Sequence, residues 1–172
     1  MRAIHLASIP LLLLSALPLA AQDPGWVGDA RKVATSIPPK LLAVLTDEIA
    51  KGGPEGAIGV CKDVAPQMAK AASAETGWAI RRVSVRNRNP RAVPDAWERA
   101  VLEDFDRRAA AGEAPATLEK AEIVVVDGKQ HYRYMRALPV QPLCLNCHGA
   151  PEQLTPAVRQ KLKELYPDDK AT

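Results

Sequence analysis

Hydrophobic positions recur with a helical period near the start of the domain. Leu41, Leu42, Leu45 and Ile49 fall on one face of a helix, and Gly52-Gly53-Pro54 should end it. We therefore expect an amphipathic helix that stops at this glycine pair.

A second helical period runs from residue 55 to about residue 73. Ile58, Cys61 and Met68 recur on one face, which should carry Cys61 and Met68 toward the interior. Pro66 interrupts the pattern, because a proline inside a helix removes a backbone hydrogen bond and its ring clashes with the preceding turn. This helix is expected to kink or end just after Cys61.

Strand patterns come later in the chain. Residues 78–85 read as a strand. Residues 121–126 and 129–138 are separated by Asp127-Gly128, a dipeptide that favours a tight hairpin turn. The sequence therefore predicts one antiparallel hairpin and a further strand.

Two more helices have clear starts. Pro94-Asp95 should open a helix with Val101 and Phe105 on its apolar face, and Thr155-Pro156 should cap a last helix that ends near Tyr166. Helices combined with antiparallel strands, without internal repeats, predict an α+β domain.

The N-terminal segment 1–21 has the features of a secretory signal. Met1-Arg2 gives a positive charge, residues 9–19 form an apolar core of 11 residues, and Leu19-Ala20-Ala21 is a small-residue cleavage site. The alternative is an uncleaved membrane anchor, but the core is short against the ~20 residues that span a bilayer. We expect cleavage, a single mature domain of residues 22–172, a periplasmic location and no stable membrane anchor.

Composition limits the remaining possibilities. The 172 residues are 47% hydrophobic and 25% charged, which is typical of one globular domain that is stable without disulfides. Loss of Arg2 with the signal leaves 22 of the 23 basic residues against 20 acidic ones. This near balance argues against a nucleic-acid partner.

The three cysteines are the most informative residues. Exported thiols tend to form disulfides, and an odd number leaves one thiol without a partner. Cys144-Leu145-Asn146-Cys147-His148 has the spacing of covalent c-type haem attachment, in which Cys144 and Cys147 form thioethers and His148 binds the iron. The other nitrogen of His148 should donate to a nearby backbone carbonyl. We therefore expect one covalent haem c.

Paired cysteines at this spacing have two other common uses. A thioredoxin-like redox pair would need a strand that leads directly into a helix at the motif, and a zinc site would need further ligands such as Cys61 or His131. Instead, the motif has prolines and a glycine close on both sides, which favours a loop or a single helical turn. The flanking residues are Pro139, Pro142, Gly149 and Pro151.

The other side of the iron has four candidate ligands: Cys61, Met68, His131 and Met135. His131 lies in the predicted hairpin, where an exposed strand position is the simpler interpretation. Cys61 is favoured because ferric iron stabilises a thiolate, although a free cysteine is commonly an inert core residue.

Arginines could pair with the haem propionates or form a solvated basic face. These arginines are Arg81, Arg82, Arg86, Arg88 and Arg91.

The order of the motifs resembles a known family, the single-haem c-type cytochromes with a PAS-like fold. Its members occur as free periplasmic proteins and as extracytoplasmic sensor domains of bacterial receptors. The similar segments, between about Lys40 and Asp169, are Val60-Cys61-Lys62-Asp63-Val64-Ala65-Pro66, Arg81-Arg82-Val83-Ser84, Arg88-Asn89-Pro90, Pro94-Asp95-Ala96-Trp97-Glu98 and Cys144-Leu145-Asn146-Cys147-His148-Gly149.

The resemblance implies a PAS-like antiparallel sheet with flanking helices and one covalent haem. In a characterised branch of the family the iron has Cys/His axial ligands, which correspond by motif position to Cys61 and His148. Two departures are evident. Arg91-Ala92-Val93 lacks an asparagine that is common in the family, and Tyr166-Pro167-Asp168-Asp169 is followed by three residues instead of a final strand. Either the sheet lacks its last strand or the chain is truncated.

Three functional classes follow from these residues. An electron carrier needs a six-coordinate haem, and a redox sensor would act through a signalling receptor because the chain has no output module of its own. A peroxidase-like enzyme or a gas-binding protein would need an open sixth position at the iron. An enzyme would also need an acid or base on that side of the haem, and His131 is poorly placed for this task. We expect a redox protein with a partner protein or receptor, and not an enzyme.

Overall fold

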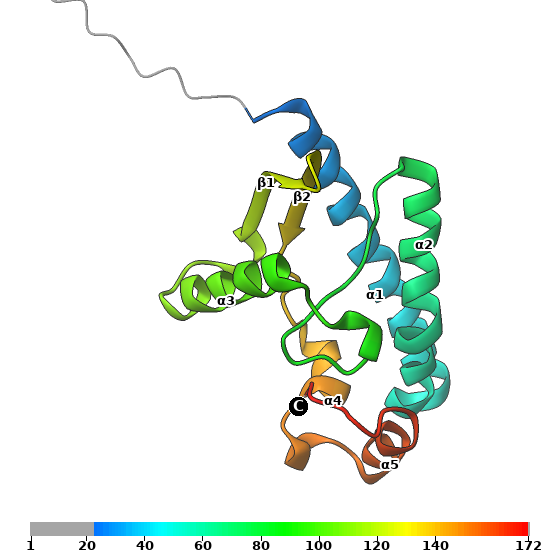
Figure 1. Ribbon diagram of the computed structural model, residues 1–172. Helices are drawn as coiled ribbons and strands as arrows, with labels where there is room; N and C mark the ends of the chain where they lie inside the picture. The colour runs from blue at the N-terminus through cyan, green and yellow to red at the C-terminus, as the bar shows by residue number, and fades with distance from the viewer. Residues whose placement is uncertain (1–22, 172) are drawn as a thin grey trace, which may run out of the picture.

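The computed structural model describes residues 23–171, which form an α+β domain as expected. It consists of four longer helices and one antiparallel hairpin, and the first helix lies at its centre (Figure 1). In chain order the elements are α1 (Gly25–Gly59), a π-helical turn (Val60–Val64), α2 (Ala65–Thr76), α3 (Ala96–Ala110), β1 (Glu119–Val126), β2 (Lys129–Arg136), the one-turn helix α4 (Leu145–His148) and α5 (Pro156–Leu165). The predicted signal segment 1–21 lies outside the described residues.

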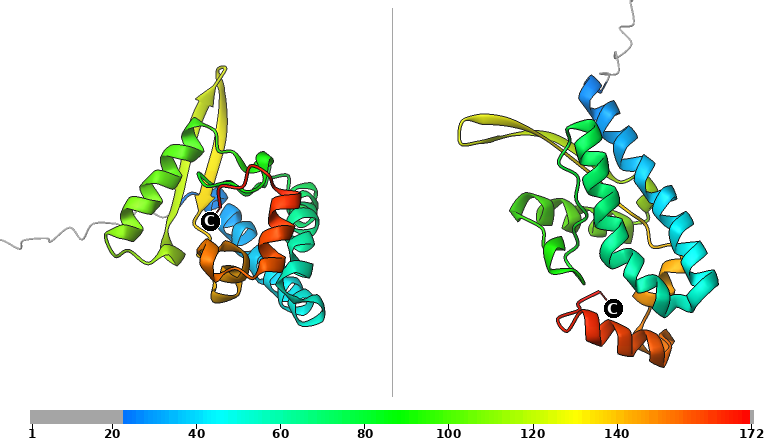
Figure 2. Two further views of the ribbon diagram at one scale, coloured as in Figure 1. Left: turned by 90° about the horizontal axis from the view of Figure 1, so that it is seen from below. Right: turned by 90° about the vertical axis from the view of Figure 1, so that its right-hand side faces the viewer.

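Helices α1 and α2 run side by side in opposite directions, and α5 lies across their shared end (Figures 1 and 2). The hairpin and α3 lie on the other side of α1, and the hairpin tip projects from the body of the domain (Figure 2). Within residues 23–171, no helix is both long and apolar enough to cross a membrane.

The glycine pair interrupts α1 as predicted. Gly52 and Gly53 have non-helical backbone angles, and Gly53 has a φ of 70° that disfavours any residue with a side chain. The prediction that Pro66 kinks or ends the helix after Cys61 is wrong in its detail. The chain passes through the π-helical turn Val60–Val64 and continues, so that Pro66 lies in the first turn of α2, where its missing N–H costs little.

The hairpin follows its sequence signal closely. Strands β1 and β2 pair antiparallel from Glu119 opposite Arg136 to Val126 opposite Lys129. Asp127 and Gly128 have φ values of 51° and 75°, so both turn residues are left-handed, as a tight hairpin turn with a right-handed twist requires. The sheet in the described residues has these two strands.

The strand expected at residues 78–85 is absent from the structure. This segment is irregular, and its backbone bonds go to other partners: Ile80 N–H donates to Ser73 Oγ (3.0 Å), and Ser84 N–H donates to the Ala92 carbonyl (3.0 Å). A strand needs a paired neighbour, and these bonds tie the segment to α2 and to the following loop instead. Residues suited to strands were therefore not sufficient to form one.

The predicted starts of α3 and α5 are both confirmed by side-chain caps, from Asp95 and Thr155 respectively.

Two apolar clusters organise the domain. One cluster joins α3 to the hairpin and consists of Val101, Phe105 and Leu118, with Met135 packed against them. The other joins α5 to α1 and consists of Ile58, Leu154, Val158, Leu162 and Tyr166, with Cys147 packed against them.

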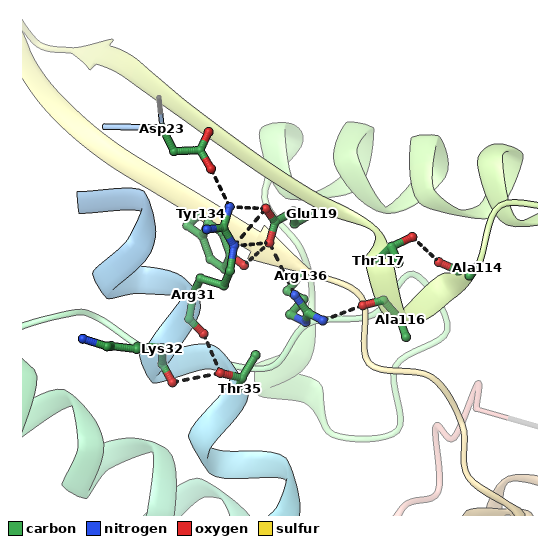
Figure 3. Close-up of polar contacts among 10 residues, drawn as sticks. All are labelled: Asp23, Arg31, Lys32, Thr35, Ala114, Ala116, Thr117, Glu119, Tyr134 and Arg136. Atoms are coloured by element: carbon green, nitrogen blue, oxygen red, sulfur yellow. Dashed lines mark hydrogen bonds and ion pairs between the residues drawn. The ribbon is translucent and has the colours of Figure 1, made fainter. Parts of the chain in front are cut away.

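An ionic network fixes the hairpin to α1 (Figure 3). Arg31 donates through Nε and Nη2 to the Glu119 carboxylate at 2.5–3.1 Å, and through Nη2 to Asp23 at 2.8 Å. Tyr134 Oη also donates to Glu119 (2.6 Å), and Arg136 pairs with Glu119 at 3.4 Å. The hydrogen bonds from Arg31, followed by that from Tyr134, lower the pKa of Glu119 to about 2, against the opposing effect of partial burial.

This network predicts a pH-dependent stability. Glu119 should protonate near 4.5 in the unfolded chain and near 2 in the folded protein. Its stabilising effect is therefore complete above pH 4.5 and is lost as the pH falls toward 2. Glu119→Gln should lower the free energy of unfolding at pH 7, and the difference from the wild type should shrink between pH 4.5 and 2. Urea unfolding at a series of pH values measures this difference.

Glu164→Gln on the exposed part of α5 is the control for loss of one carboxylate, since an exposed ion pair contributes little. A Glu119→Gln difference that stays constant from pH 7 to pH 2 would contradict the prediction.

Candidate cofactor site

The segment Cys144–His148 forms a compact turn, as its flanking prolines predicted. A 3₁₀ turn, Pro142–Cys144, leads directly into the four-residue helix α4. Cys144 and Cys147 are three positions apart on this turn and so share a face. Gly149 closes the turn and is buried, and a Cβ atom there would lie 2.6 Å from the Leu145 carbonyl oxygen. The segment therefore requires glycine after His148.

Cys147 attaches this turn to α1. Its side chain is half-buried and packs against the cluster that joins α5 to α1. Its Sγ lies 3.9 Å from the Pro54 carbonyl oxygen, immediately after the glycine pair that interrupts α1. Burial raises the pKa of the Cys147 thiol, and the charge of Arg88 acts in the opposite direction. The interruption of α1 is thus where the motif docks.

Cys61 comes from the π-helical turn and reaches the same region. Burial raises the pKa of its thiol, the charge of Arg82 lowers it, and the neighbouring Cys144 raises it further. Cys61 in turn acts on the pKa of Cys147. All three cysteines are unpaired, half-buried thiols. The fold therefore places the third thiol in the same region as the two thiols of the motif. It lies on a π-helical turn, a feature that is frequent at functional sites.

His148 is held as a neutral imidazole. Burial, and then the charges of Arg88 and Arg82, lower the pKa of His148 to about 4, while a hydrogen bond with the backbone of Ala171 acts the other way. At neutral pH one ring nitrogen therefore has a free lone pair, which is the form that binds a metal.

Arg88 connects the motif to the end of the described chain. Its Nε donates to Asp169 Oδ2 (2.7 Å), and its Nη2 donates to the Cys147 carbonyl (2.8 Å). The Arg88 and Asp169 side chains are only 10% and 15% exposed. The C-terminal end of the chain lies beside α4 (Figure 1).

The alternative iron ligands lie elsewhere in the domain. His131 is exposed on β2, opposite Val124, as its strand pattern predicted. Met135 packs into the cluster between the hairpin and α3, and Met68 is half-buried on α2, further along the chain than Cys61. Three of the five candidate arginines are also accounted for differently. Arg81 pairs with Glu98 at the start of α3, and Arg86 and Arg91, unlike Arg82 and Arg88, have no effect on the pKa of Cys61 or His148.

The donor set fits a covalent haem. Two thiols three positions apart would supply the two thioethers, and an adjacent imidazole and a third thiol would supply axial ligands, if a haem were bound. In the described range 23–171, no three His, Cys, Asp or Glu side chains are grouped closely enough to hold a metal ion by themselves. An iron already held by a porphyrin needs only one or two ligands from the protein.

Sequence reasoning missed Asp169 and did not single out Arg88 among the arginines. Asp169 lies 81 residues after Arg88, and no local pattern connects them.

Comparison with known families gives one match, which covers residues 19–172. The chain belongs to the Tll0287-like family. The matched region of this Tll0287-like protein includes the π-helical turn with Cys61, the Cys144–His148 segment and Asp169. No curated protein and no solved structure matches the chain.

Proposed function

We propose that this Tll0287-like chain is an exported monohaem c-type protein with a redox role, in which Cys144 and Cys147 tether the porphyrin and His148 and Cys61 bind the iron. The observation that carries the proposal is the convergence of Cys61, from between α1 and α2, with a motif more than 80 residues later. A core cysteine would need only apolar neighbours. Cys61 instead lies near enough to the Cys144 thiol and to two arginines for their charges to affect its pKa.

Each residue has a distinct task in this proposal. Bound haem would supply an iron that exchanges one electron between its ferric and ferrous states. His148 is already neutral and needs no deprotonation to bind. Cys61 would have to release its thiol proton, because burial favours the protonated form. The cationic Arg82 is exposed and acts on both Cys61 and His148, so it is the arginine best placed to offset a thiolate or a propionate.

The wider setting of the proposal follows from the sequence. The signal at residues 1–21 supports export to the periplasm, and the family resemblance supports a PAS-like relationship. The partner would be a redox protein or a signalling receptor. An open sixth position, as in a peroxidase or gas-binding protein, is the alternative. It has less support, because His131, the spare histidine of the mature chain, is exposed on the hairpin.

The direct test is covalent attachment. The full chain, expressed together with a bacterial c-type haem attachment system, should keep one haem when it is denatured. Intact mass spectrometry and haem staining of a denaturing gel measure this. Haem that separates from the denatured chain, or a chain that takes up none, would contradict the proposal.

A further inference from the structure

Arg88 makes a contact that α4 cannot make for itself. Helix α4 ends at His148, so the carbonyl of Cys147 has no partner within the helix. Arg88 Nη2 donates to this carbonyl at 2.8 Å. The peptide between Cys147 and His148 is thereby fixed, and with it the direction in which the His148 side chain leaves the backbone.

Asp169 holds Arg88 in this position, and the residues that follow Asp169 pack near the His148 ring. The two side chains form a nearly buried ion pair at 2.7 Å. Lys170 N–H donates to the Asn87 carbonyl (3.2 Å), and Ala171 N–H donates to Asp169 Oδ1 (2.8 Å). The backbone of Ala171 lies close enough to the His148 ring to affect its pKa. The ion pair therefore contacts the peptide that precedes His148 through Arg88, and through Asp169 it holds the backbone of Ala171 near the ring.

We infer that Arg88 is a positioning residue for His148: together with Asp169 it fixes α4 and the segment 169–171 around the imidazole before any cofactor is attached. A buried ion pair is costly to desolvate, and removing one partner leaves an uncompensated charge. Such a pair is well suited to fixing one geometry. The inference rests on the proposed role of His148 as an iron ligand, but the contacts themselves are formed by the chain alone.

The chain contains a matched control. Arg81 also bridges a carboxylate and a backbone carbonyl, since its Nε donates to Glu98 (3.0 Å) and its Nη2 donates to the Val93 carbonyl (2.9 Å). This bridge lies at the start of α3 and involves no residue of the motif. Loss of either arginine removes the same kinds of bond, although the Arg81 side chain is 49% exposed and that of Arg88 only 10%. Faster exchange confined to the motif in the Arg88 variant therefore reports position rather than general stability.

The first measurement is hydrogen–deuterium exchange on the full chain as purified. Arg88→Gln and Asp169→Asn should each speed amide exchange in residues 144–149 by about tenfold or more, as expected when a charge-assisted hydrogen bond is lost. Arg81→Gln should speed exchange near residues 93–99 and leave the motif unchanged. Equal exchange at the motif in the Arg88 and Arg81 variants would overturn the inference.

The second measurement is the ferric spectrum of the haem-loaded chain. Arg88→Gln should keep its covalent haem but show a high-spin fraction, because His148 is no longer held at the iron, whereas Arg88→Lys should restore part of the low-spin signal. A fully low-spin Arg88→Gln protein would overturn the inference. If Arg88→Gln fails to fold, two other measurements test the inference. One is the spectrum of Asp169→Asn, and the other is the protection of the wild-type Arg88 Nε proton from exchange in NMR. An unprotected Nε proton would contradict the inference.

The two proposals fail in different ways. A chain that takes up no haem but shows the local exchange effect contradicts the proposed function and leaves the positioning role intact. A chain that binds haem covalently but shows no faster exchange at residues 144–149 in the Arg88 variant supports the proposed function and contradicts the positioning role.

Discussion

Cys61→Ala should leave the haem covalently attached and abolish the thiolate character of the ferric spectrum. In the wild type we expect a low-spin, six-coordinate iron, because His148 and the Cys61 thiolate occupy both axial positions. Alanine supplies no ligand, so the iron should become high-spin or take up water. Absorption and electron paramagnetic resonance spectra of the purified ferric protein measure the change.

Met68→Leu is the matched control for this substitution. Met68 follows Cys61 on α2 and is half-buried, but the proposal gives it no role at the iron. Leucine conserves its volume, so this variant should keep the wild-type spectrum. A spectrum unchanged by Cys61→Ala, or one changed by Met68→Leu, would return the sixth position to the methionines or His131.

Elements fixed by their own residues could be predicted from the sequence. Asp127-Gly128 determines a hairpin because its residues tolerate the left-handed backbone that the turn needs. Asp95 and Thr155 begin α3 and α5 because their side chains cap the first turn. In each case the cause lies within a few residues of the effect.

Elements that depend on distant partners could not be predicted in this way. Residues 78–85 contain side chains suited to a strand, but the described residues provide no neighbouring strand for them. The helix break expected at Pro66 is replaced by a π-helical turn, which shifts the following residues on the helix surface. A periodicity argument assumes one constant period, so it missed this adjustment next to Cys61.

The candidate site also has residues that local sequence could predict and residues that it could not. The motif spacing predicted roles for Cys144, Cys147 and His148, and the odd cysteine count drew attention to Cys61. The structure adds that these residues share one region, and that Arg88 and Asp169 support them. That support depends on an ion pair across 81 residues, which only the folded chain reveals.

The largest change should come from removing both motif thiols. The Cys144→Ala, Cys147→Ala double variant should carry no haem after denaturation, because thioethers to these two sulfurs are the proposed covalent links. Each single variant should keep haem through the remaining sulfur at reduced yield.

Cys61→Ala controls for loss of a half-buried thiol in the same region, and its covalent haem content should equal that of the wild type. Intact mass spectrometry of all four variants compares them directly. Haem retained by the denatured double variant would show that another residue forms the link. Equal loss from Cys61→Ala would show that attachment depends on the fold around the thiols rather than on Cys144 and Cys147 themselves. The division of the three cysteines into two tethers and one iron ligand therefore rests on these variants responding differently.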